Sequence, residues 1–464
     1  MVIHMKIWIN KCIEKEKSTY FNDAITFNLN VPGKGGLIAS NIRDGWYRKL
    51  GIQSVSPICE DLYILALSVF AADKRISRSF SSDGWTRKLH LSIPVIEYSH
   101  WNSVRTSLEK MLSFLSGDIW TIDFRECEPT NRYQDNHKRP PQILVSLEEY
   151  DAVSLLSGGL DSYCGAYELL SQGKNVIFVG FKEFGKLEQI QNEIVHHFNE
   201  SFPETSKMLF TFTAKAYKPL GIEKLPAENT SRSRSFLFLA AAICVAEAIG
   251  ANTPVYIPEN GFIGLNLPLT PGRKGSCSTR TTHPYFLKML NQILLQLGIN
   301  HEIINPYAFM TKREMIQQHK DSAGFLDCVF KTISCSHPCN TRWHGKSLPE
   351  NCGYCYPCLI RQSSLLDLTV PNEHYTFDAL SYDYIVHATN SRRSDLVDLL
   401  SSISTAVKSD DQALLKRIKQ TGQLSKEEVI AFLRLYKATI NDLLELFSRD
   451  KDLMRMIGME YAPN

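Results

Sequence analysis

The sequence has little of several features that would assign a protein to a class at once. Neither sign of charge dominates, because 51 Lys and Arg residues stand against 49 Asp and Glu residues and leave a formal charge of +2. This balance gives no global electrostatic reason to expect a protein that binds nucleic acid or a membrane surface. The longest strongly apolar run, residues 236–246, has eleven residues, well short of the ~20 that a membrane span requires. The N-terminus lacks the pattern of a secretion signal, so we expect a soluble, cytoplasmic protein.

Internal repeats and low-complexity tracts are absent as well, so the organisation of the 464 residues follows from the strand and helix patterns alone. A chain of this length predicts two or three domains. In residues 1–140, strand-like segments such as "AITFNLNV" and "TRKLHLSIPV" mix with helical ones such as "CEDLYILALSVFAADKRI". We interpret this part as an N-terminal α+β accessory domain with antiparallel strand pairing, followed by a polar linker over residues 128–142.

A different pattern begins near residue 141. Strand-like segments, including "AVSLL", "NVIFVGF" and "MLFTFT", alternate with helical segments such as "LEQIQNEIVHHF" and "SFLFLAAAICVAEAIG". This alternation predicts parallel βα units, and therefore a doubly wound α/β sheet over residues 141–370 with helices on both faces. Beyond it the strand patterns fade. Amphipathic segments, one begun by the capping-box sequence "SKEE", predict a helical C-terminal region over residues 371–464.

The segment "SLLSGGLDS", residues 154–162, joins a predicted strand to a predicted helix. It matches neither G-x-x-x-x-G-K-[ST], because the lysine is missing, nor G-x-G-x-x-G. A helix N-terminus offers unpaired N–H groups to an anion, and preceding glycines let the backbone approach it closely. We expect Ser157, Gly158, Gly159 and Ser162 to bind phosphate, and Asp161 to hold a Mg²⁺ ion that bridges phosphate oxygens. An ordinary strand-to-helix turn is the alternative.

Five of the twelve cysteines lie close together in "SCSHPCNTRWHGKSLPENCGYCYPC". Cys352, Cys355 and Cys358 form two overlapping C-x-x-C steps, and Cys335 and Cys339 are possible fourth ligands. Four thiolates are the donor set of a closed, tetrahedral zinc site, and in a reducing compartment such spacing indicates a metal before a disulfide. We therefore predict a structural Zn²⁺ ion. Free thiols, redox chemistry and an iron–sulfur centre are the alternatives.

"LSGGLDS" resembles the SGGxDS signature of the PP-loop ATP pyrophosphatases, which bind ATP and Mg²⁺ and usually activate a carboxyl or carbonyl oxygen by adenylation. In that family the strand after the loop helix runs beside the adenine, which implies ATP contacts for Phe178, Val179 and Gly180. The loop followed by S-C…C-G-x-C-x-x-C resembles QueC, the 7-cyano-7-deazaguanine synthases of deazapurine biosynthesis. This resemblance covers about residues 150–366 and implies Cys335 as the first zinc ligand, with Cys339 as an alternative.

Two further segments are similar to QueC. "SRSRSFLFLAAAICVAEAIGA" looks like the arginine-bearing helix start that this family uses near ATP, and "NPYAFMTKREMI" resembles its lysine-rich helix start before the cysteines. The resemblance implies that Arg234 and Lys312, together with Asp161 and Ser162, are catalytic candidates. The two cations would stabilise charge on the α-phosphorus, and a surface ion pair is the alternative for each.

The segment "IPENGFIGLNLPLTPGRKGSCSTRTTHPYF" stands where QueC carries its deazaguanine-recognition stretch, but the aspartate and "GYPDCR" usual there are missing. We expect this loop, which also contains Arg273 and Lys274, to bind a substrate or a partner. We also expect Thr282 to cap the helix that follows. A plain surface loop is the alternative. The substrate-binding candidates are Glu259, Asn260, Arg280, Thr281, Thr282 and His283.

This loop, the cysteine segment and the N-terminal domain resemble the QueC-like proteins of bacterial antiphage operons, among them QatC of the Qat system. The resemblance implies a deazapurine substrate and a companion protein of a defence operon, which is a candidate for modification. It implies ATP-dependent adenylation of a 7-deazaguanine-type carboxylate, followed by transfer to a protein amine or to ammonia. A sulfur-inserting tRNA thiolase and an ATP-binding scaffold are the alternatives. We expect neither a membrane nor a nucleic acid as a direct partner.

Overall fold

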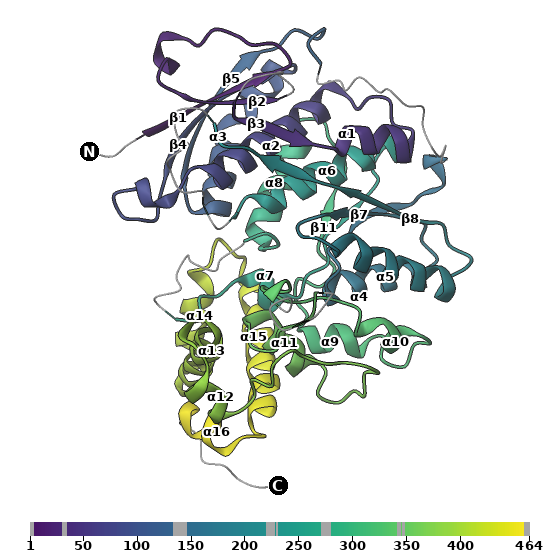
Figure 1. Ribbon diagram of the computed structural model, residues 1–464, viewed down its shortest axis with the longest axis vertical. Helices are drawn as coiled ribbons and strands as arrows, with labels where there is room; N and C mark the ends of the chain where they lie inside the picture. The colour runs from purple at the N-terminus through teal and green to yellow at the C-terminus, as the bar shows by residue number, and fades with distance from the viewer. Residues whose placement is uncertain are drawn as a thin grey trace.

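The computed structural model describes residues 4–29, 35–132, 146–219, 228, 231–270, 280–340, 345 and 349–458. Arg273 and Lys274 of the predicted binding loop lie outside these ranges, as do Trp343 and His344, which we expect to order the cysteine segment. The described residues form two β-sheets with their covering helices and a C-terminal group of helices (Figure 1).

The first sheet has the strand order β5-β4-β1-β2-β3-β9. Its five N-terminal strands pair in parallel, and only β9 is antiparallel. The expected antiparallel pairing, and with it the α+β class of residues 1–140, is therefore wrong. Helices α2 (Pro57–Arg75) and α3 (Tyr98–Ser116) precede β4 and β5, and such crossovers return the chain in the same direction. The strands are β1 (His4–Lys11), β2 (Ile25–Leu29), β3 (Leu37–Ser40), β4 (Lys88–Val95), β5 (Ile119–Glu126) and β9 (Ala214–Ala216).

The second sheet is entirely parallel, with the order β11-β10-β6-β7-β8. Alternate residues of β7 face opposite cores: Ile177 and Val179 pack on the side of α6, whereas Val176 and Phe178 pack against α4 and α5. Helices cover both faces, so the sheet is the parallel α/β sheet predicted. Its elements are β6 (Ala152–Leu155), α4 (Leu160–Ser171), β7 (Val176–Phe181), α5 (Leu187–Ser201), β8 (Lys207–Phe212), α6 (Arg234–Ile249), β10 (Val255–Tyr256), α8 (Pro284–Gln296) and β11 (Ile303–Ile304).

One hydrophobic core extends from the first sheet to the second. Helix α6 is buried along nearly its whole length because α2 packs on one side of it and the second sheet on the other. The start of the expected linker is also anchored, since Arg132 donates to Glu60 of α2 at 2.7 Å. Residues 1–140 and 141–370 therefore share a core, and the boundary between them remains a proposal.

The C-terminal helices pack together and against the second half of the α/β part (Figure 1). The capping box predicted at "SKEE" is present, with Ser425 and Glu428 at the start of α15. Among the described residues we find no helix with the length and apolarity needed to cross a membrane. The helices beyond α8 are α9 (Lys312–Gln317), α10 (Phe325–Val329), α11 (Tyr356–Ser364), α12 (Tyr382–His387), α13 (Asn390–Lys408), α14 (Asp411–Lys419), α15 (Lys426–Phe447) and α16 (Lys451–Ile457).

Candidate active site

The "SGGLDS" segment forms a tight loop between β6 and α4. Gly158 has φ +86°, which favours glycine, and a Cβ there would lie 3.1 Å from the Leu187 side chain. Ser162 Oγ donates to the Gly159 carbonyl at 2.9 Å and lies 3.1 Å from Ser157 Oγ. Two hydroxyls therefore meet beside the N-terminus of α4, an arrangement suited to binding a phosphate group.

Ile333 and Ser334, just before Cys335, hold this loop in place. The Ile333 N–H donates to the Gly158 carbonyl at 2.8 Å, and the Leu160 N–H donates to Ser334 Oγ at 3.1 Å. Asn351 fixes this segment in turn by accepting from the Ser334 N–H at 2.9 Å. In the sequence, only the proximity of Ile333 and Ser334 to Cys335 indicates that these residues could contact the loop.

Asp161, in the first turn of α4, is held by three donors. Its Oδ2 accepts from the backbone N–H of Asn260 at 3.0 Å and from Asn260 Nδ2 at 2.7 Å, and Lys312 pairs with its Oδ1. Burial raises the pKa of this carboxyl, but the Lys312 charge and the Asn260 donors outweigh burial and hold the pKa below its ordinary value. Asp161 is therefore ionised, and a Mg²⁺ ion bound through it would replace the Lys312 contact.

Glu259 lies beside Asp161, but the pKa of its carboxyl is shifted in the opposite direction. The Thr282 hydroxyl donates a hydrogen bond to the Glu259 carboxylate, and the backbone N–H of Glu259 donates to Asn305 Oδ1 at 3.1 Å. Burial raises the pKa of the Glu259 carboxyl to about 7, and the nearby Asp161 charge adds to that rise. A carboxyl that titrates near neutral pH can exchange a proton with a reacting group.

Two adjoining cavities meet at this group of residues. The first has a volume of about 230 Å³ and is lined by the loop, by Val179 and Phe181 of β7, and by the start of α6. The second has a volume of about 700 Å³ and is lined by Asp161, Lys312 and the segment before and after Cys335. Five residues line both cavities, namely Ser157, Glu183, Arg234, Pro258 and Glu259.

Strand β7, which the resemblance places beside the adenine, lines the first cavity with only one of the three residues predicted to contact ATP. Val179 lines the first cavity, but Phe178 points into the core formed by α4 and α5. Gly180 leaves space for Gln191, whose Nε2 would lie 2.8 Å from a Cβ at this position. Phe181, not among the predicted ATP contacts, does line the cavity. The alternation of side chains along β7 explains this pattern, since only every second residue faces the same side.

The predicted substrate residues are divided among three locations. Thr281 and Thr282 line the first cavity with Glu259, and Asn260 is buried as the N-cap of α7 (Gly261–Leu265). Arg280 donates to the Phe114 carbonyl of α3 at 2.7 Å, outside both cavities. His283 caps α8 in place of the expected Thr282. The remaining ring nitrogen of His283 lies 3.1 Å from Thr421 Oγ1 of the C-terminal helices.

Arg234, the first residue of α6, lines both cavities and forms an ion pair with Glu183. Its side chain is partly exposed, and burial lowers the pKa of the guanidinium from its ordinary value. Arg234 and Lys312 thus flank the loop from opposite helices, α6 and α9, which brings the two predicted cations to one site.

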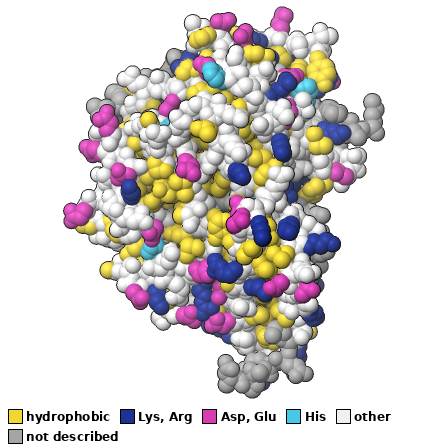
Figure 2. Space-filling model, turned by 180° about the vertical axis from the view of Figure 1, so that it is seen from behind, with side chains coloured by type: hydrophobic (Ala, Val, Ile, Leu, Met, Phe, Trp, Pro, Cys, Tyr) yellow, Lys and Arg dark blue, Asp and Glu magenta, His cyan; other side chains and the backbone are white. Residues whose placement is uncertain are grey.

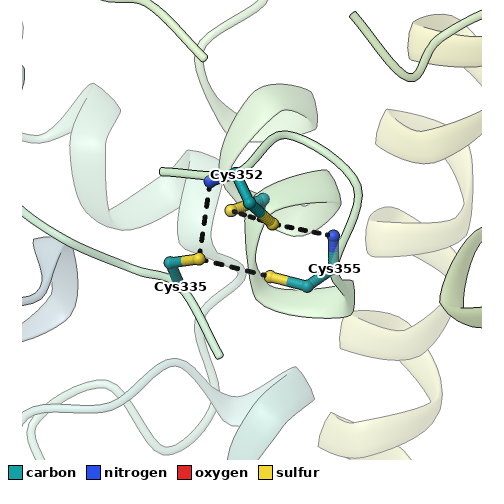
Figure 3. Close-up of side chains that lie close together, drawn as sticks. Cys335, Cys352 and Cys355 are labelled. Carbon is teal, nitrogen blue, oxygen red and sulfur yellow. Dashed lines mark hydrogen bonds between the residues drawn. The ribbon is translucent and has the colours of Figure 1, made fainter. Parts of the chain in front are cut away.

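Cys335, Cys352, Cys355 and Cys358 converge with all four sulfur atoms within 4.8 Å of one another. Figure 3 shows the first three side chains pointing toward one another. Backbone N–H groups point at the sulfurs, as from His337 to Cys335 at 3.3 Å, a pattern typical of thiolates that bind a metal. Cys339 is not in the cluster, so the structure selects Cys335 as the fourth member. The donor set fits Zn²⁺ and leaves no open coordination position.

Comparison with known proteins agrees with this geometry. Residues 148–255 match the family model described as "Thiamine biosynthesis protein (ThiI)". The chain is 28% identical over 243 residues to the 7-cyano-7-deazaguanine synthase of Leptospira interrogans, which covers 47% of this chain and 88% of the relative. It is 25% identical over 233 residues to the 7-cyano-7-deazaguanine synthase of Prochlorococcus marinus, and this alignment covers 47% of this chain and 95% of the relative. A ThiI-like PP-loop domain and distant synthase homologues together support a QueC-like, ATP-using enzyme.

Proposed function

We propose that this chain is an ATP-dependent ligase that adenylates a 7-deazaguanine-type carboxylate and transfers the acyl group to an amine on a partner protein. The observation that carries the proposal is the convergence of the Ser157–Ser162 loop, the Asp161–Lys312 pair and Glu259 where two cavities adjoin. One cavity would accept the nucleotide and the other the amine. The synthase homologues support the deazapurine as the small-molecule substrate.

In the first step, a carboxylate oxygen attacks the α-phosphorus of ATP. The bond from the α-phosphorus to the bridging oxygen breaks, and pyrophosphate leaves as the acyl adenylate forms. Ser157, Ser162 and the N-terminus of α4 would bind the phosphates. Arg234 and Lys312 would stabilise the charge that develops on them. A bound Mg²⁺ ion would add charge neutralisation at the phosphates.

In the second step, the amine nitrogen attacks the acyl carbon, the bond from that carbon to the phosphate oxygen breaks, and AMP leaves. The nitrogen must lose a proton. Glu259 lines both cavities, and its pKa of about 7 suits a proton acceptor at neutral pH. The four cysteines would have a structural role only, because a zinc ion bound by four thiolates has no open position for substrate.

A free synthase that uses ammonia is the second candidate, and the similarity to 7-cyano-7-deazaguanine synthases favours it. The substituted loop and the added N-terminal part favour a protein acceptor, and the resemblance to antiphage proteins makes a companion protein of a defence operon the candidate. Basic and acidic side chains are mixed on the face shown in Figure 2, which gives no support for an RNA-binding surface there.

Intact-mass spectrometry of companion proteins tests the proposal. Each would be co-expressed with wild type or with Asp161→Ala in cells that make the deazapurine precursor. We expect a mass increase equal to one deazapurine acyl group only with wild type. Companions that stay unmodified while wild type releases a free nitrile would favour the synthase. An Asp161→Ala variant that keeps full biological function without cleaving ATP would instead indicate a scaffold.

A further inference from the structure

Arg232 lies two residues before α6 and is held by the N-terminal part of the chain. Its Nη1 donates to the Ser116 carbonyl at 3.0 Å, and its guanidinium lies 4.2 Å from the centre of the Trp85 ring. The residue is 4% exposed, and Nη2 has no hydrogen-bond partner in the described part of the chain. Arg232 nevertheless lines the first cavity. One side of the guanidinium is therefore fixed, while the other carries a free donor.

Ser235, in the first turn of α6, is likewise a buried polar residue that lines the first cavity. It is 6% exposed, and its Oγ also has no partner among the residues that the structure describes. Buried polar groups normally find a hydrogen-bond partner, because leaving one unpaired is unfavourable. Two such groups at one helix start, both lining one cavity, indicate a ligand that supplies the acceptors.

Asp73 of α2 makes this helix start rigid. Its Oδ2 accepts from the backbone N–H of Arg232 at 2.7 Å and from the backbone N–H and hydroxyl of Ser233 at 2.9 and 2.8 Å. Arg87 neutralises the same carboxylate at 2.6 Å. These supports come from residues that precede the PP-loop match at 148–255. The N-terminal part thus fixes Arg232, which lines the first cavity, although none of its own described residues lines that cavity.

We propose that Arg232 and Ser235 form an oxyanion subsite in the first cavity, supported by Asp73 and Trp85 of the N-terminal part. A charged guanidinium N–H and a hydroxyl suit phosphate or carboxylate oxygens, and the N-terminus of α6 adds a favourable helix dipole. The oxyanion is a phosphate of ATP or the carboxylate of the acid substrate. The inference rests on the proposed function, because both ligands belong to it.

Titration calorimetry with the full chain tests the subsite, using ATP, adenosine and 7-carboxy-7-deazaguanine as separate ligands. A hydrogen bond to a charged group corresponds to about 10- to 100-fold in affinity. We expect Ser235→Ala and Arg232→Gln to weaken binding of one oxyanion by about tenfold or more. A loss with ATP but not with adenosine assigns the phosphate, whereas a loss confined to the acid assigns the carboxylate.

Ser154→Ala is the matched control, since Ser154 Oγ is also buried without a hydrogen-bond partner among the described residues but lines neither cavity. It should bind all ligands as wild type does. Ser235→Ala removes no hydrogen bond within the described chain and should keep the wild-type melting temperature, so it tests the subsite even if Arg232→Gln fails to fold. Unchanged affinity for ATP and for the acid in folded Ser235→Ala overturns the subsite. Wild type that binds neither ligand overturns the proposed function itself, and the subsite with it.

Discussion

Lys312 forms an ion pair with Asp161, which joins the first turn of α9 to the first turn of α4 at the Ser157–Ser162 loop. Asn260 holds the other oxygen of the same carboxylate through two hydrogen bonds. Two of the catalytic candidates, Asp161 and Lys312, are therefore in direct contact. A Mg²⁺ ion held by Asp161 would compete with Lys312 for the carboxylate, and the phosphates of ATP would compete with Asp161 for the ammonium.

Lys312→Met tests the part of this cation in the chemistry. It removes a positive charge beside the expected phosphates, and we expect substrate-dependent pyrophosphate release to fall by about 100-fold or more, the loss typical of a preorganised charge-stabilising donor. The control is Lys320→Met, which changes an exposed lysine just beyond α9. A rate within twofold of wild type in Lys312→Met would show that Lys312 only neutralises Asp161.

Glu259 predicts a pH dependence of stability. Its pKa is raised from an ordinary 4.5 to about 7, so the folded state holds the proton more tightly than the unfolded chain. Its contribution to stability is full below pH 4.5 and is lost as the pH rises to about 7. Wild type should therefore lose stability relative to Glu259→Gln over this range, and not above it.

Urea denaturation at pH 5 and pH 8 measures this difference. Glu204→Gln, at an exposed position, should track wild type at both values. If wild type and Glu259→Gln differ by the same free energy of unfolding at both pH values, the raised pKa of Glu259 is contradicted, and the proton-acceptor role with it.

The cysteine cluster predicts a metal content. Wild type should contain about one zinc per chain by elemental mass spectrometry, because one set of four thiolates completes one tetrahedral site. Cys352→Ser should lose the metal and melt at a lower temperature. Cys339→Ser should retain it, since Cys339 lies outside the cluster. Loss of zinc from Cys339→Ser would contradict the assignment of Cys335 as the fourth ligand.

Arg361 predicts a coupling between the cysteine module and the loop. This fully buried side chain pairs with Glu373 and donates to Thr332 Oγ1 at 2.6 Å, next to the Ile333–Ser334 segment that holds the loop. We expect Arg361→Met to lower the free energy of unfolding by about 3–5 kcal/mol, because it removes the fully buried cation of an ion pair with the partly buried Glu373, and to weaken ATP binding. Arg455→Met removes an exposed pair and should change stability by at most about 1 kcal/mol. Comparable losses in both variants would argue against this coupling.

Local patterns were enough to predict the second sheet and the loop. The alternation of apolar strands and amphipathic helices, and the glycines before Asp161, are properties of short segments. The cysteine spacing likewise predicted the cluster. Spacing alone allowed Cys335 or Cys339, the resemblance to QueC implied Cys335, and the structure places Cys335 in the cluster, directly after the loop-binding Ser334.

Features that depend on distant segments could not be predicted in this way. Strands β1 and β4 pair although α2 separates them, and no local pattern states which strands become neighbours. Arg280 and His283 carry the residue types of a binding loop, yet they contact α3 and the C-terminal helices. The contact of Asp73 with the start of α6 joins two parts of the chain that the sequence analysis treated as separate domains.

The most direct test of adenylation follows an oxygen atom. Purified protein would receive ATP, Mg²⁺, an amine acceptor and 7-carboxy-7-deazaguanine labelled with ¹⁸O in its carboxylate, and the AMP would be analysed by mass spectrometry. Because the carboxylate oxygen attacks the α-phosphorus and leaves with it, we expect one ¹⁸O atom in the AMP phosphate, with Asp161→Ala forming no labelled AMP. AMP that forms without the label, or ADP as the only nucleotide product, would contradict the proposed reaction.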